Sequence, residues 1–298
     1  MRICRFNSNR LGVIQDDQVF DVSGALAELP ASSYPLPGHD LLIAHLGQVR
    51  AHIEQILPRA VPVPLQRVNL KSPVANPGKI IGAPFNYRKH LQEVRADPGI
   101  HHNTQILEIQ KIGVFLKATS SLVGAGEGVV IRHPERRNDH EAELVVVIGK
   151  TGARIHRKDA WQHIAGYSSG LDMTTRGPEE RSLRKSVDSY CVLGPCFVTA
   201  DEMADASNLD FSLTVNGEPR QKANTRDLII GIAELIEFAS SFYTLYPGDL
   251  IYTGTPEGVG RVLPGDLITT EFQGIGRMDV AVWAAPQEAA DTSQVKEI

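Results

Sequence analysis

The stretch HEAELVVVIGK, residues 140–150, predicts a buried strand with two carboxylates at its start. Its apolar run, residues 144–148, is short and rich in β-branched side chains, which favours a strand over a helix. Residues two apart in a strand point to the same face, so Glu141 and Glu143 would hold their charges side by side. Two carboxylates that close raise each other's pKa unless a cation lies between them. The stretch therefore predicts a position for a cation, although Glu-x-Glu by itself is also typical of a solvated strand edge.

A third carboxylate is expected to join this pair from the segment AGYSSGLDMTTRG. Asp172 ends a weakly apolar stretch there, beside Gly170, in a segment that has the composition of a protein interior. Glu141, Glu143 and Asp172 form a ligand set of oxygen atoms only, which suits Mg²⁺, Mn²⁺ or Ca²⁺ and not Zn²⁺. Three carboxylates would leave part of an octahedral shell open for water or for a chelating substrate.

The composition limits the classes of function. The chain has 298 residues, 42% of them hydrophobic and 22% charged, which is typical of a globular protein with one large domain and a small one. The net charge of −5 argues against a nucleic-acid partner. The 3 cysteines have no metal-type spacing, and no signal peptide or membrane-length apolar stretch is visible. We expect a cytoplasmic protein without a membrane anchor.

Residues 1–72 are predicted to form a small α+β domain. Two strand-like runs flank a hairpin turn at Asp16-Asp17. An apolar helix face then follows, formed by Leu42, Leu46, Val49, Ile53 and Ile56. The prolines between residues 58 and 77 predict a linker. Residues 73–286 would form the main domain, and residues 287–298 a polar tail.

Strand-like runs outnumber helices in the main domain, which predicts a β-rich α+β fold. Turns such as Pro-Gly-Asp precede strands at residues 247–251 and 264–268, as in an antiparallel or mixed β roll. One helix is expected within residues 227–245. The lack of alternating strands and helices argues against a doubly wound parallel sheet.

The segment NYRKHLQEV contains a second reactive pair. His90 and Glu93 are three residues apart, so they would share a face of a helix. A carboxylate bonded to one imidazole nitrogen orients the ring and leaves the other nitrogen to take a proton from water. A simple surface pair is the alternative interpretation.

Several basic and polar residues could contact a substrate. Arg176 and Lys185 follow Asp172 in the sequence and could neutralise an enolate or a carboxylate, although a charged surface loop would look the same. The loop YTGTPEGVGR matches no phosphate-binding motif, but its glycines with Thr253 and Thr255 could bring N–H groups close to a substrate carboxylate. We expect another group of basic residues to lie on a solvated face, namely Arg132, Arg136 and Arg137.

Together these segments resemble the fumarylacetoacetate hydrolase family, and the small N-terminal unit is similar to that of many bacterial members. The matching segments, in chain order, are KIIGAPFNYRKHLQE, FLKATSSLVG, DHEAELVVVIGK, AGYSSGLDMTTR, RKSVDSYCVLGPCFVTADE, TVNGE and GDLIYTGTPEGVG. The resemblance covers residues 79 to about 284. It implies a mixed β-sandwich roll, Mg²⁺ or a similar ion, a homodimer, and a 2-oxo or acylpyruvate acid as substrate.

The resemblance also implies roles for particular residues. Glu141, Glu143 and Asp172 would hold the metal, and His90 with Glu93 would activate water. The resemblance places further residues near the substrate: Lys185 as a catalytic cation, and Arg176, Thr255, Lys117 and Glu179 as substrate contacts.

The sequence departs from the family pattern at several positions. Some members have a fourth carboxylate where this chain has Ala83, so three ligands are expected. Gly177 stands where many members have aspartate, and Glu179 stands where some have glutamine. An acid at position 179 would repel a substrate carboxylate. The segment from 94 to 113 is unusually long and is expected to be lid-like.

The favoured hypothesis is a metal-dependent hydrolase that cleaves a C–C bond in an acylpyruvate, of the fumarylacetoacetate or fumarylpyruvate type. The intact His90 and Glu93 pair favours hydrolysis, because decarboxylation needs the same enolate but no water. The alternatives are a decarboxylase or isomerase of 2-oxo acids, such as oxaloacetate or 2-hydroxyhepta-2,4-diene-1,7-dioate, and a non-catalytic binding protein.

Overall fold

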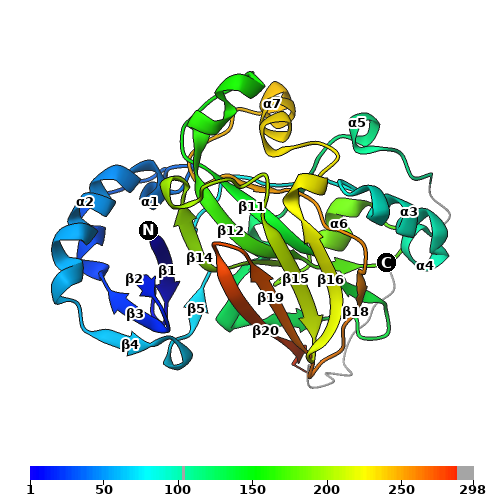
Figure 1. Ribbon diagram of the computed structural model, residues 1–298, viewed down its shortest axis with the longest axis horizontal. Helices are drawn as coiled ribbons and strands as arrows, with labels where there is room; N and C mark the ends of the chain where they lie inside the picture. The colour runs from blue at the N-terminus through cyan, green and yellow to red at the C-terminus, as the bar shows by residue number, and fades with distance from the viewer. Residues whose placement is uncertain (103–104, 287–298) are drawn as a thin grey trace, which may run out of the picture.

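The computed structural model describes residues 1–102 and 105–286, and the predicted polar tail lies outside these residues. They form a strand-rich mixed fold with several sheets, which confirms the predicted fold class. Figure 1 shows the N-terminal unit, in blue, at one side of a larger body of crossing sheets.

The largest sheet has twelve strands and extends through both parts of the chain. Its order is β4 (Pro62–Pro64), β3 (Gln18–Asp21), β2 (Arg10–Gln15), β1 (Arg2–Phe6), β14 (Cys191–Thr199), β12 (Ile164–Asp172), β11 (Ala142–Ile148), β17 (Leu250–Tyr252), β6 (Ile80–Gly82) and β7 (Phe115–Lys117), with β5 (Leu70–Lys71) beside β1 and β8 (Leu122–Gly124) beside β14. Only two of its pairs, β17 with β6 and β14 with β8, are parallel in the described part of the chain. The prediction against a doubly wound parallel sheet is thereby confirmed.

Two smaller sheets and short helices complete the fold. One sheet contains β16 (Glu218–Asn224), β15 (Asp210–Val215), β19 (Leu267–Phe272), β20 (Gly276–Ala284) and β9 (Val129–Ile131), and the other contains β13 (Thr174–Thr175), β10 (Asn138–His140) and β18 (Gly260–Arg261). The α-helices are α1 (Leu41–Ala44), α2 (Leu46–Ile56), α3 (Arg88–Ala96), α4 (Pro98–His101), α5 (Ile109–Ile112), α6 (Arg181–Lys185) and α7 (Ile232–Phe242). Within residues 1–102 and 105–286, no helix combines the length and the apolar character needed to cross a bilayer.

Strand β11 lies in the middle of the large sheet and is buried along its whole length. Leu144, Val146 and Ile148 pack into the core shared with the five-stranded sheet. Val145 and Val147 pack into a second core with residues of the N-terminal unit. An uninterrupted apolar run is what a strand covered on both faces requires, so the predicted strand is confirmed.

The N-terminal unit confirms the predicted hairpin, because Gln15 pairs with Gln18 around the turn at residues 16–17. The predicted single helix is two helices, since the backbone of His45 leaves the helical region between α1 and α2. The predicted linker contains the strands β4 and β5. Strand β1 pairs with β14, and the second core joins Ile3 and Ile53 to β11. A boundary at residue 72 stays a prediction.

Candidate functional site

Strand pairing brings the three predicted ligand carboxylates together. In the antiparallel pair of β11 and β12, Glu143 lies opposite Gly170, and the Asp172 N–H donates to the Glu141 carbonyl at 2.9 Å. One carboxylate oxygen from each of Glu141, Glu143 and Asp172 lies within 4.8 Å of the others. All three side chains are buried. Glu141 directly before β11, Glu143 within β11 and Asp172 at the end of β12 therefore converge on one point.

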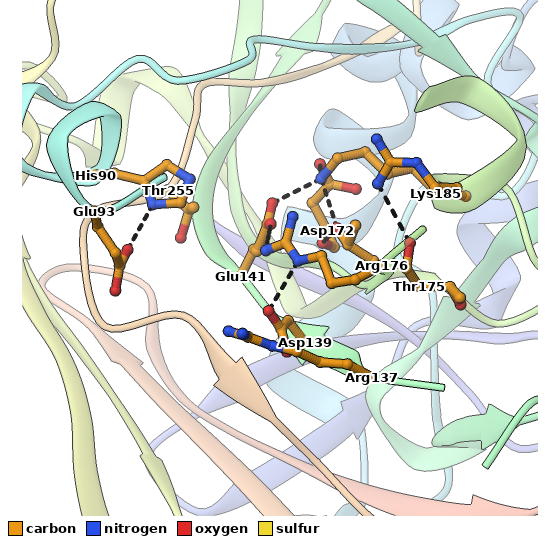
Figure 2. Close-up of polar contacts among 12 residues, drawn as sticks. His90, Glu93, Arg137, Asp139, Glu141, Asp172, Thr175, Arg176, Lys185 and Thr255 are labelled. Carbon is orange, nitrogen blue, oxygen red and sulfur yellow. Dashed lines mark hydrogen bonds and ion pairs between the residues drawn. The ribbon is translucent and has the colours of Figure 1, made fainter. Parts of the chain in front are cut away.

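Cations from three other segments contact this cluster, and Figure 2 shows two of them, Lys185 and Arg176. Lys185 Nζ donates to Glu141 Oε2 and to Asp172 Oδ2, each at 2.7 Å. Arg176 Nη2 donates to Glu141 Oε1 at 2.8 Å. The Lys117 ammonium donates to Asp172 Oδ1. Glu141 and Asp172 are thus each bonded to two cations.

Glu143 lies in a different electrostatic environment. Its Oε2 accepts a hydrogen bond of 2.6 Å from Gly254 N–H, and it makes no ion pair among the described residues. Burial and the negative charge of Asp172 raise the pKa of Glu143 well above its usual value. Burial also opposes ionisation of Glu141, but Lys185 and Arg176 lower its pKa below the usual range.

This cluster of donors fits a divalent cation. Three buried carboxylates with oxygen atoms at ligand spacing match the hard, oxygen-only coordination of Mg²⁺ or Mn²⁺. The carboxylate of Glu143 is not neutralised by a side chain, so a cation would relieve its repulsion from Asp172. The absence of a carboxylate at Ala83, which lines the same cavity, leaves three protein ligands.

Replacing Glu143 with glutamine is expected to stabilise the metal-free protein at alkaline pH. Because the folded state raises the pKa of Glu143, folding favours its protonated form. The stability that wild type gains from protonated Glu143 is fully present below the unfolded carboxyl pKa of about 4.3. It is lost as the pH rises through the pKa of Glu143 in the folded state. Metal-free E143Q should therefore melt above metal-free wild type at pH 8, by about 2–4 °C for each kcal/mol of repulsion removed. Thermal unfolding in EDTA at pH 5 and pH 8 measures this, and an equal difference at both pH values would contradict it.

The predicted pair His90 and Glu93 lies on one face of α3. His90 Nδ1 is 2.8 Å from Glu93 Oε2, and Glu93 Oε1 accepts from the Gly258 N–H at 2.9 Å. His90 is only 3% exposed. It lines the same cavity as the three carboxylates, with its ring nitrogen Nδ1 held by Glu93.

The loop after β17 supports both groups. Gly254 has φ +104°, a conformation that favours glycine, and this places its N–H against Glu143. Thr255 lines the cavity, donates to the Ala142 carbonyl at 3.0 Å and accepts from Gln221 at 2.9 Å. The predicted glycine loop therefore lies at the site, but its N–H groups bind site carboxylates of the protein itself.

A chain of ion pairs behind the cluster was not predicted from the sequence. Arg176 Nε donates to Asp139 Oδ2 at 2.9 Å, and Asp139 Oδ1 accepts from Arg137 at 2.8 Å. Arg137 also bonds Asp97, which caps α4. Asp139 continues the alternation of Glu141 and Glu143, a signal that could have identified it.

The expectation of a solvated face for the basic cluster was wrong for two of its residues. Arg137 is 31% exposed and Arg136 is 25% exposed, because each is held by carboxylates around the site. Arg136 forms two hydrogen bonds to Glu179, at 2.7 and 3.1 Å. Arg132 is half exposed and pairs with Asp188, as expected for a solvated face.

The segment from 94 to 113 contributes to one wall of the cavity. It contains the end of α3, the helices α4 and α5, and residues 103–104, which lie outside the described part. Ile100, His101 and Ile106 line the cavity from this segment. Glu179 lines it too.

Comparison with known proteins gives consistent matches. Residues 79–283 match the family described as fumarylacetoacetate (FAA) hydrolase C-terminal. A maleylpyruvate hydrolase of Aquipseudomonas alcaligenes is 57% identical over 284 residues, which are 95% of this chain and 99% of that protein. The mitochondrial oxaloacetate tautomerase Fahd2a of Rattus norvegicus is 31% identical, with 93% of this chain and 90% of that protein covered.

A solved structure gives the same relationship in three dimensions. The crystal structure of maleylpyruvate hydrolase from Sphingobium sp. SYK-6, in complex with manganese(II) ion and pyruvate, superposes with a TM-score of 0.81 at 40% identity. The match covers 96% of this chain and 100% of that chain.

Proposed function

The chain belongs to the fumarylacetoacetate hydrolase family, and on that premise we propose that it hydrolyses maleylpyruvate to maleate and pyruvate. The observation that carries this proposal is a single cavity lined by His90 and by all three of Glu141, Glu143 and Asp172. A water-activating group and a divalent-metal site in one cavity are the two elements that this hydrolysis requires.

We propose Mn²⁺ or Mg²⁺ as the ion, held by Glu141, Glu143 and Asp172; Ca²⁺ suits the same ligand set. The manganese and pyruvate in the Sphingobium structure support this choice. When bound, the ion would act as a Lewis acid for the 1-carboxylate and 2-oxo group of the substrate.

His90 is proposed as the general base. Glu93 holds Nδ1, so Nε2 is the atom that takes a proton from water. Glu93 is itself fixed by the Gly258 N–H, which keeps the ring in one orientation. The water oxygen then forms a bond to the C4 carbonyl carbon.

Breaking the C3–C4 bond releases maleate and leaves its electron pair as the enolate of pyruvate. Lys185 is proposed to stabilise this negative charge, because its ammonium already lies between Glu141 and Asp172. The proton that His90 took from water is then passed to C3, which completes pyruvate. Arg176 and Lys117 would hold the ligand carboxylates in place, and Thr255 would contact the substrate.

A second candidate function is tautomerisation or decarboxylation of oxaloacetate, favoured by the similarity to the rat tautomerase. The Mn²⁺-loaded protein should be assayed side by side with maleylpyruvate, fumarylpyruvate and oxaloacetate. We expect maleylpyruvate to release maleate and pyruvate in equal molar amounts. Turnover of oxaloacetate without cleavage of either acylpyruvate would favour the second candidate. No turnover, with no thermal stabilisation by Mn²⁺, would favour a non-catalytic binding protein.

The assembly and location are also part of the proposal. We propose that the protein is a homodimer in the cytoplasm, as the family resemblance implies for the dimer. The three cysteines are buried and unpaired, which fits a reducing compartment. Size-exclusion chromatography with light scattering would measure the oligomeric state.

A further inference from the structure

Two arginines on α6 line the cavity without a carboxylate partner among the described residues. Arg181 makes no hydrogen bond or ion pair with any of the described residues. Arg184 donates only to backbone carbonyls, those of Glu179 at 2.8 Å and Thr175 at 3.3 Å. Arg176 and Lys185, in contrast, are bonded to site carboxylates. Two half-buried positive charges are therefore left to face the cavity.

Aromatic rings hold Arg181 near the reactive groups. Its guanidinium lies 5.0 Å from the Phe85 ring centroid and 5.6 Å from that of Phe115. The Phe85 ring is 6.2 Å from the His90 ring, and Lys185 Nζ is 5.4 Å from the Phe115 centroid. Arg181 thus lies one aromatic ring away from the proposed base and one ring away from the proposed enolate-stabilising cation.

The backbone of Phe85 has an energetically unfavourable conformation. Its φ is +53°, in the left-handed region that bulky residues rarely adopt. The next residue, Asn86, fixes the loop through hydrogen bonds to the Ile230 and Thr253 carbonyls at 2.9 and 2.8 Å. A strained backbone held by its neighbours is typical of functional sites. Here it places the ring between His90 and Arg181.

The charges of both arginines favour an anion at this end of the cavity. Burial and the positive charge of Arg184 lower the pKa of Arg181, and burial and Arg176 lower that of Arg184. Among the described residues that line the cavity, the acid outside the three-carboxylate cluster is Glu179, and it is bonded to Arg136. A guanidinium pair without its own anion can bind a carboxylate through charge-assisted hydrogen bonds.

We propose that Arg181 and Arg184 bind the distal carboxylate of the acyl group, and so select acylpyruvates whose acyl group is itself an acid. This inference rests on the proposed function and adds a specificity site to it. The carboxylate would lie beyond the scissile carbonyl, against the wall of the cavity that α6 forms.

The test compares R181Q and R184Q with R132Q, in which the altered arginine pairs with Asp188 outside the cavity. Each Mn²⁺-loaded protein is assayed with maleylpyruvate and with acetylpyruvate, which lacks the distal carboxylate. Losing a charge-assisted hydrogen bond should lower the ratio of kcat/KM for maleylpyruvate to that for acetylpyruvate by about 10- to 100-fold. R132Q should keep the wild-type ratio, and R181K and R184K should fall between wild type and the glutamine variants.

A binding measurement keeps the inference testable without turnover. Calorimetry on the Mn²⁺-loaded proteins compares maleate with isocrotonate, which carries a methyl group in place of one carboxylate. Wild type should bind maleate more tightly, and R181Q and R184Q should lose that preference. Equal losses for both ligands, or an unchanged ratio in both variants, would overturn the inference. Failure of wild type to cleave any acylpyruvate, with the maleate preference intact, would instead count against the proposed function.

Discussion

Replacing His90 with alanine is expected to lower kcat for maleylpyruvate by about 10²- to 10⁴-fold, the usual contribution of a general base. The imidazole is the basic side chain that lines the cavity with Nδ1 already bonded to Glu93, so Nε2 is positioned to take the proton of water. Steady-state kinetics on Mn²⁺-loaded H90A would measure the effect.

Two variants separate this role from a structural one. H90A should still bind Mn²⁺ with wild-type affinity by calorimetry, because His90 is not among the three proposed ligands. E93Q keeps the size of the side chain but loses its charge, so its activity should fall less than that of H90A and its pH profile should shift. Undiminished hydrolysis by H90A would remove the dyad from the mechanism.

Removing the metal is expected to have an effect of similar or larger size. EDTA-treated protein should lose activity by about 10³-fold or more, since the Lewis acid contributes several kcal/mol and each 1.36 kcal/mol is tenfold in rate. Added Mn²⁺ should restore the activity of EDTA-treated wild type. It should not restore the activity of EDTA-treated D172N, which lacks one of the three ligand charges. Mn²⁺ at 100 times its dissociation constant should also stabilise wild type by about 2.7 kcal/mol.

The matched control is D188N, which changes an exposed aspartate paired with Arg132. Its activity and its thermal response to Mn²⁺ should equal those of wild type. Full turnover after chelation, or a normal Mn²⁺ response in D172N, would contradict the assignment of Asp172 as a ligand.

Local patterns in the sequence predicted the parts of the site that depend on neighbouring residues. The alternation of Glu141 and Glu143 and the three-residue spacing of His90 and Glu93 each follow from the geometry of one strand or one helix. The fold class followed from the strand-rich pattern of the main domain, and the family resemblance agreed with it.

Contacts between distant segments were beyond the sequence pattern. Arg137 belongs to a basic run, and nothing in that run indicates its hydrogen bond to Asp97. Nor does the sequence distinguish Arg181 from Arg184 and Lys185 in one short charged helix; only the packing shows that Lys185 is bonded to carboxylates and Arg181 lies between two rings. The break at His45 likewise depends on backbone geometry that the apolar periodicity does not reveal.

The pairing of β1 with β14 has a consequence for attempts to shorten the chain. Deleting residues 1–72 would leave β14 with unpaired backbone groups at Phe197 and Val198, and would remove core residues that cluster with Val145 and Val147. An unpaired strand edge beside exposed aliphatic side chains promotes association with other chains. Such a truncated product is expected to aggregate on expression, as light scattering would report. We therefore expect residues 1–72 to be needed to keep the rest of the chain in solution.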